Sequence, residues 1–243
     1  MRLNKCVFLF FVIFSSCVFG SYSVVETPNK FKAIVYLPEY YEPHKSYPVL
    51  TALHGMYESM YTSYRRWKTV ADALDMILLC PEGSSRVNAY VRKSKDDMRS
   101  VTELFMMLDM TYNVNRQLSL LIGFSRGGNI ALEMGVRFPD VFPNIISFFG
   151  FFERKNIERY YKKLPSVHFR RLRYFLITGH GDSTETSMKE AFDFFSNRNI
   201  SVQLFRYLNL SHGLPKNLNE IIDFVINSLD ERRSVIIDMN NTI

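Results

Sequence analysis

The sequence predicts a single α/β domain in which helices cover both faces of a mostly parallel sheet. Short apolar runs alternate with longer segments of helical period along most of the 243 residues. The run from Leu118 to Ile122 is interrupted only by the small Ser119, which is typical of a parallel strand buried on both faces. No internal repeat, linker or shift in composition divides residues 24–229, so we expect one domain there.

Composition and charge exclude several classes of protein. The chain contains 21 Phe and 14 Tyr, which is more apolar surface than disordered or low-complexity chains carry. Its formal charge is +6, and loss of Arg2 and Lys5 with a leader would leave 28 basic against 24 acidic residues, or +4. No Lys/Arg-rich run with interleaved aromatic residues follows. We therefore expect no nucleic-acid partner.

The N-terminus has the pattern of a signal peptide over residues 1–20. A basic start is followed by the apolar run Cys6 to Phe14 and by small residues up to Gly20. The whole apolar stretch is about 14 residues, short of the roughly 20 that a transmembrane helix needs, so the mature form should have no stable membrane span. We expect export to the periplasm or the extracellular space. Lipid anchoring through Cys17 is an alternative, although Phe14 stands where lipoprotein signals carry an aliphatic residue.

Seven strands are expected where short apolar runs end in turn-forming residues. They are Phe31–Leu37, Pro48–His54, Met76–Cys80, Gln117–Gly123, Asn144–Gly150, Leu172–Thr178 and Ser201–Leu208. Helices are expected where apolar residues recur every three or four positions. These positions include Met98 to Tyr112, Ile130 to Met134, Met188 to Phe195, and Leu218 to Leu229. Residues 230–243 are predicted to be a polar C-terminal tail.

Cys6 and Cys17 lie within residues 1–20, so Cys80 is the one cysteine left after loss of the leader. We therefore expect no internal disulfide in the mature fold. Cys80 ends the apolar run that begins at Met76. A buried structural thiol is therefore favoured over a nucleophile.

Ser125 is the candidate nucleophile. It lies in Gly123-Phe124-Ser125-Arg126-Gly127, directly after a predicted strand and before a predicted helix. A serine on such a sharp turn exposes its hydroxyl, and the Arg126 N–H at the helix start faces developing negative charge. The alternative is that Ser125 only caps the helix.

A serine hydroxyl needs a base, and the base needs a carboxylate. His212 follows the last predicted strand and precedes the last helix, and Asp182 follows the strand before it, which gives the chain order Ser, acid, His. Glu185 and Asp193 are rival acids, and His180 is interpreted as a surface loop residue. The catalytic prediction is Ser125, Asp182 and His212.

The motif Leu53-His54-Gly55-Met56 ends an early strand, where a backbone N–H can face the same point as the Arg126 N–H. We assign the two oxyanion-hole donors to Met56 and Arg126. His54 is expected to support this loop rather than transfer protons.

These motifs together resemble the α/β-hydrolases, and specifically the esterase group that includes feruloyl esterases, acetylxylan esterases and poly(3-hydroxybutyrate) depolymerase-type enzymes. The resemblance rests on Pro48 to Gly55, Pro81-Glu82-Gly83, Tyr112 to Arg116, Gly123 to Gly128, Phe138 to Phe142, Gly179 to Asp182, and His212. It implies a serine hydrolase that needs no cofactor or metal and acts on esters, with Ser125, Asp182 and His212 as its triad. Met56-Tyr57-Glu58 departs from the further glycines or aromatic residue that this group often has after His-Gly.

The expected substrate is a small or conjugated ester. Gly150 to Arg171 is short for a lid, so we expect a minimal lid or none and an open site for short acyl groups or exposed esters. Tyr57, Tyr61, Trp67 and Phe151 are candidate pocket residues, but aromatic residues this frequent more often serve ordinary core or surface packing. Two other functions are a prolyl oligopeptidase-like peptidase and a catalytically inert binding protein with this fold.

Overall fold

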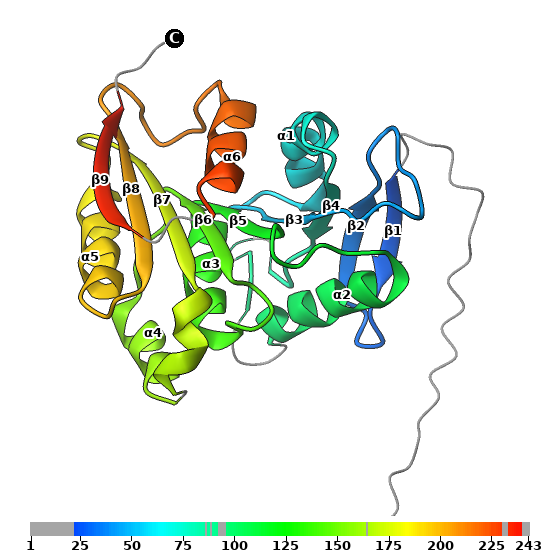
Figure 1. Ribbon diagram of the computed structural model, residues 1–243, viewed down its shortest axis with the longest axis horizontal. Helices are drawn as coiled ribbons and strands as arrows, with labels where there is room; N and C mark the ends of the chain where they lie inside the picture. Colours follow the sequence, from blue (N-terminus) through cyan, green and yellow to red (C-terminus); the bar gives the residue numbers. More distant parts are fainter. Residues whose placement is uncertain are drawn as a thin grey trace, which may run out of the picture.

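The computed structural model describes residues 22–85, 87, 89–91, 96–163, 165–229 and 233–239 (Figure 1). The predicted signal peptide, residues 1–20, and Cys17 within it lie outside these residues. Among the helices that are described, none is both long and apolar enough to cross a membrane.

In the described part of the chain, a twisted sheet of nine strands forms the centre of the domain, in the order β1-β2-β4-β3-β5-β6-β7-β8-β9. Neighbouring strands run parallel from β4 to β9, and the two pairs at the β1 edge, β1 with β2 and β2 with β4, are antiparallel. The bounds are β1 Tyr22–Glu26, β2 Lys32–Tyr36, β3 Val49–Leu53, β4 Ile77–Pro81, β5 Leu120–Phe124, β6 Asn144–Phe148, β7 Arg173–Gly179, β8 Ser201–Tyr207 and β9 Ser234–Met239.

The described residues form six α-helices. These helices cover the two faces of the sheet (Figure 1). Helices α1 and α6 lie on one face, and α2, α3, α4 and α5 lie on the other. The bounds are α1 Met60–Ala73, α2 Asp97–Thr111, α3 Arg126–Arg137, α4 Arg154–Tyr161, α5 Glu185–Ser196 and α6 Leu218–Asn227.

Each face of the sheet has its own buried apolar cluster, which explains the nearly continuous apolar strands. In β5, Leu121 packs with the cluster under α2 to α5, whereas Leu120 and Ile122 pack with the cluster under α1 and α6. A strand that is buried on both faces needs apolar side chains at successive positions. The burial pattern therefore follows from the sequence of the central strands.

The structure confirms the predicted α/β class, all seven predicted strands and the predicted helices. Cys80 is fully buried and free in β4, and burial raises the pKa of its thiol well above the usual range, which agrees with a structural role. Strands β1 and β9 and helices α1 and α4 were not predicted. In α1 a serine, Ser63, occupies a buried position of the helix and breaks the apolar pattern.

Strand β9 lies within residues 230–243, so the prediction of a polar tail there is wrong for Ser234–Met239. The strand pairs in parallel with β8 along its whole length, from Ser234 opposite Val202 to Met239 opposite Tyr207. The sheet thus extends from Tyr22 to Met239, beyond the predicted limits of 24–229. In β1 nearly all residues are exposed, and in β9 exposed and partly buried residues alternate, so neither edge strand has the continuous apolar run that predicts a buried strand.

The connection between β6 and β7 is small. Its described residues contain α4 and a short 3₁₀ turn at Ser166–Arg171, and α4 packs against α3. This agrees with the expected minimal lid.

Candidate active site

Ser125 lies on the sharp turn between β5 and α3 with φ 52° and ψ −116°. Such a positive φ is strained for a residue with a side chain and is common at functional sites. The turn is held by the Ser125 N–H, which donates to the Phe148 carbonyl at 2.8 Å. The Ser125 side chain makes no capping hydrogen bond to α3, so the helix-cap alternative is wrong.

Two glycines make this turn possible. A Cβ at Gly123 would lie 2.2 Å from the Gly127 carbonyl oxygen, and a Cβ at Gly127 would lie 2.4 Å from the Leu53 carbonyl oxygen. Any side chain at either position would therefore push α3 away from the sheet. The second contact also brings the first turn of α3 against the end of β3, which leads into the loop of Met56.

His212 faces the Ser125 hydroxyl from the loop between β8 and α6. Its Nε2 lies 3.1 Å from Ser125 Oγ, within hydrogen-bond distance. The rings of Phe124 and Phe149 lie 5.4 and 5.1 Å from the imidazole, centroid to centroid. Phe149 is fully buried and has φ 52°, so a second strained residue borders the site.

Asp182 faces the other side of the His212 ring. Its Oδ2 lies 3.5 Å from His212 Nδ1, and its side chain is only 7% exposed. The other oxygen, Oδ1, accepts hydrogen bonds from the Thr184 N–H at 2.8 Å and the Thr184 hydroxyl at 2.7 Å. Burial alone would raise the pKa of Asp182, but the bonds from Thr184 and the proximity of His212 outweigh it and lower the pKa. Asp182 is therefore a carboxylate at neutral pH.

The structure distinguishes Asp182 from its rivals. Glu185 contacts His180 and Arg206 instead of His212, and Asp193 is an exposed residue inside α5. His180 is exposed, as expected of a loop residue. Ser125, Asp182 and His212 come from the carboxyl ends of β5, β7 and β8, which are parallel and end at the same edge of the sheet.

Met56 and Arg126, the predicted oxyanion donors, lie at this same edge of the sheet. Within the described part of the chain, no hydrogen bond uses the backbone N–H of either residue, so both are available to a ligand. Arg126 is the first residue of α3, and its side chain turns away to an ion pair with Glu153 at 2.6 Å. The helix dipole favours negative charge at this N–H.

His54 supports the loop before Met56. The ring is buried, its Nδ1 lies 2.8 Å from the Gly55 carbonyl, and its Nε2 accepts the Gly83 N–H at 3.1 Å. Both ring nitrogens are thus occupied by backbone groups, which agrees with the expected structural role.

Glu58 and Arg66 brace the same loop, and no motif predicted them. Glu58 Oε2 accepts the Gly55 N–H at 2.7 Å, and Arg66 donates to both Glu58 oxygens at 3.1 and 2.6 Å. The Arg66 guanidinium also lies 4.9 Å above the Phe124 ring, next to Ser125. Burial opposes ionisation of Glu58, but Arg66 and the Gly55 N–H outweigh it and lower its pKa. This pair therefore links the Met56 loop to the turn of Ser125.

We expect Arg66→Ala to lower kcat about 10-fold while KM changes less than twofold. The loop would lose its link to Phe124, and the Met56 N–H would be less well placed. The measurement is steady-state hydrolysis of a short p-nitrophenyl ester. Arg65→Ala is the matched control, because Arg65 is the exposed neighbour in α1 and should keep wild-type kinetics. Equal kinetics of the two variants would contradict a role of Arg66 in the site.

The candidate pocket residues differ in how exposed they are and in what they pack against. Tyr57 and Phe151 are 66% and 44% exposed, and Tyr57 has φ 60° in the Met56 loop. Tyr61 packs its ring against Tyr22. Trp67 has the packing role instead: it is 1% exposed and packs against Phe148 in the core, because the period of α1 turns it toward the sheet.

The mostly parallel sheet, the strained serine turn and the three aligned side chains define the α/β-hydrolase class. The chain belongs to the family described as "Putative esterase", whose model matches residues 25–159. This protein is therefore a member of an esterase family.

Comparisons with known proteins agree with this class. A bifunctional acetylxylan esterase/xylanase of Neocallimastix patriciarum is 28% identical over 96 residues, which is 39% of this chain and only 14% of that much longer relative. A solved structure of a ferulic acid esterase is 21% identical with a TM-score of 0.67 and covers 85% of this chain and 97% of its own. The serine hydrolase FphF of Staphylococcus aureus is 15% identical with a TM-score of 0.70, covering 85% and 98%. At these identities, the two structures establish the shared fold.

Proposed function

We propose that this protein is a serine esterase that cleaves carboxylic esters through an acyl-enzyme on Ser125. One observation carries the proposal: His212 Nε2 lies 3.1 Å from Ser125 Oγ, while Nδ1 of the same ring faces the Asp182 carboxylate. This is the arrangement in which an imidazole can take the serine proton and in which a carboxylate stabilises the resulting cation.

The proposed reaction has two halves. In the first, His212 accepts the Ser125 proton, Oγ attacks the ester carbonyl carbon, and the backbone N–H groups of Met56 and Arg126 bind the oxyanion. His212 then donates its proton to the leaving alcohol as the carbon–oxygen bond breaks. In the second half, His212 takes a proton from water, the resulting hydroxide attacks the acyl group, and the acid leaves as Ser125 regains its proton.

The surroundings of the site favour short acyl groups or esters that stand out from a bulky conjugate. His212 is 38% exposed in its side chain, and the apolar residues Met56, Tyr57 and Phe151 around the site are all exposed. The short β6–β7 connection supplies no large cover for a long acyl chain. We therefore infer an open site without a deep acyl tunnel.

An ester panel tests this function with the wild-type chain. We expect p-nitrophenyl acetate and butyrate to give kcat/KM values at least about 10-fold above the laurate ester. A dipeptide p-nitroanilide in the same panel tests the peptidase alternative and should not be cleaved. No hydrolysis of any ester would contradict the proposed activity, and faster cleavage of laurate would contradict the open site.

We also propose that the protein is exported. The support is the basic and apolar pattern of residues 1–20. Expression of the full chain in a bacterium with mass spectrometry of the secreted or periplasmic product should give an N-terminus near Ser21. A product that retains Met1 and stays in the cytoplasm would contradict export.

A further inference from the structure

We propose that Glu185 is a positioning residue for the triad acid, and that Arg206 and Asp238 extend this role to the C-terminal strand β9. In this proposal, the three side chains hold the turn between β7 and α5 so that Asp182 faces His212. The inference rests on the proposed function, since it assigns a task to residues around the same site.

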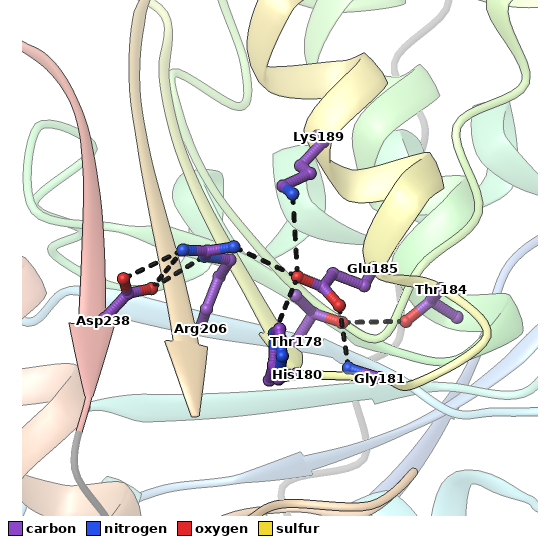
Figure 2. A network of polar contacts seen from close by, with 8 residues as sticks. All are labelled: Thr178, His180, Gly181, Thr184, Glu185, Lys189, Arg206 and Asp238. Carbon is purple, nitrogen blue, oxygen red and sulfur yellow. Dashed lines mark hydrogen bonds and ion pairs between the residues drawn. The ribbon is translucent and has the colours of Figure 1, made fainter. Parts of the chain in front are cut away.

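Glu185 is the hub of the polar network in Figure 2. Its Oε2 accepts the Gly181 N–H at 2.7 Å, and its Oε1 lies 3.3 Å from His180 Nδ1. The side chain is only 13% exposed although it stands at the start of α5. The bond from Gly181 is the main cause of a lowered pKa of Glu185, with burial acting against it, so the carboxyl is ionised at neutral pH. Glu185 therefore contacts the two residues that precede Asp182, which are His180 and Gly181.

The turn needs such an anchor. Gly181 has φ 78°, and a Cβ there would meet nothing within 4 Å, so packing does not restrain this residue. Within the turn, the Asp182 N–H donates to the Gly179 carbonyl at 3.2 Å and the Glu185 N–H donates to the Asp182 carbonyl at 3.0 Å. Without the Glu185 carboxylate, the peptide between Gly181 and Asp182 could rotate more freely. The Asp182 side chain would then move relative to His212.

Arg206 connects this turn to β9. Its Nη1 lies 3.2 Å from Glu185 Oε1, and its Nε and Nη2 donate to the two Asp238 oxygens at 2.7 and 2.9 Å. Arg206 and Asp238 are direct partners in the β8–β9 register. The bidentate pair fixes the plane of the guanidinium. Figure 2 shows Arg206 between Asp238 of β9 and Glu185, so in this proposal the C-terminal strand orients the cation that faces Glu185.

Thr184 holds the Asp182 carboxylate itself. Its N–H and hydroxyl hold Asp182 Oδ1, and the hydroxyl oxygen lies 3.0 Å from Thr178 Oγ1 in β7. Thr184 therefore orients the carboxylate, whereas Glu185 fixes the backbone on the other side of Asp182. Displacements of about 1 Å in such a constellation can cost up to about 100-fold in rate.

Steady-state kinetics of four variants test the proposal: Glu185→Gln, Arg206→Gln, Arg206→Lys and Asp238→Asn. We expect kcat to fall about 10-fold in Glu185→Gln and Arg206→Gln and about threefold in Asp238→Asn, with KM within twofold of the wild type. Arg206→Lys keeps the cation and should recover part of the loss. The double variant Glu185→Gln/Asp238→Asn should be no slower than Glu185→Gln alone, because both changes act through one chain of contacts.

Glu190→Gln is the matched control. Glu190 lies on the same helix α5 and pairs with Arg154 at 2.8 Å, outside this network. It should keep the wild-type kcat. Asp238 is 54% exposed in its side chain, so Asp238→Asn should fold even where a change at Glu185 does not. If Glu185→Gln and Asp238→Asn have the kcat of Glu190→Gln, or if only KM changes, the positioning role is refuted.

Hydrogen exchange separates this inference from the proposed function. Exchange of the peptide covering residues 179–185 should be faster in Glu185→Gln and Asp238→Asn than in the wild type and in Glu190→Gln. An inactive wild type would refute the esterase proposal, and unchanged exchange in that peptide would refute the anchoring itself. An active wild type with an unaffected Glu185→Gln would refute the positioning role alone.

Discussion

Replacing Ser125 by alanine is expected to lower kcat/KM for p-nitrophenyl acetate by about 10³- to 10⁵-fold. In the proposed mechanism, the Ser125 oxygen is the one atom of the enzyme that bonds to the acyl group, so no other side chain of the proposed triad can replace it. Because the Oγ atom makes its hydrogen bond to the loop residue His212 rather than to α3, the fold should not depend on it. The melting temperature should stay within about 2 °C of the wild type.

Ser211→Ala is the control for this variant. Ser211 is the exposed neighbour of His212, and its loss should leave kcat/KM within twofold of the wild type. Full activity of the Ser125→Ala variant would remove Ser125 from the mechanism.

A second large effect is expected for Asp182→Asn, with kcat about 10²- to 10⁴-fold lower at neutral pH. Asparagine can still accept the hydrogen bonds of Thr184, so the turn should persist, but it cannot stabilise the His212 cation. The measurement is kcat for a short p-nitrophenyl ester. Asp193→Asn is the matched control, since Asp193 is an exposed acid of α5 and a rival candidate for the triad acid. If Asp193→Asn lost activity and Asp182→Asn kept it, the acid would be misassigned.

Asp182 also makes a pH-dependent contribution to stability. Its pKa is lower in the folded protein, so its contribution is complete above the ordinary carboxylate pKa and is lost as pH falls through the lowered value. Asp182→Asn has no titrating group at this position. Its melting temperature, followed by circular dichroism from about pH 6 to pH 3, should therefore decline less steeply than that of the wild type. An equally steep decline would mean that His212 and Thr184 do not stabilise the Asp182 carboxylate.

The residues that local sequence signals could identify are those at strand ends. Ser125, Asp182 and His212 each follow an apolar strand, and parallel strands bring their carboxyl ends to one edge of the sheet. Their positions at strand ends, together with their chain order, therefore predict that the three side chains meet. Gly123 and Gly127 marked the sharp turn because only a residue without Cβ fits there.

The supporting residues could not be predicted because their partners are distant in the chain. Arg206 and Asp238 are 32 positions apart and meet only through the β8–β9 register. The segment that carries Asp238 alternates exposed and partly buried residues and follows charged residues, a pattern that does not distinguish an edge strand from a polar tail. Arg66 likewise lies in α1, a helix whose apolar period is broken by Ser63. Local motifs thus predict the candidate catalytic residues, whereas the contacts of the residues that position them depend on long-range packing.

Labelling with a fluorophosphonate tests the central claim most directly. Such a probe forms a covalent bond with an activated serine, so its adduct reports the nucleophile without any assumption about the natural ester. Intact-mass and peptide mass spectrometry of the wild type should show one adduct, on Ser125, and none in Ser125→Ala. Absence of an adduct in the wild type, or an adduct on any residue other than Ser125, would contradict the serine esterase that this site defines.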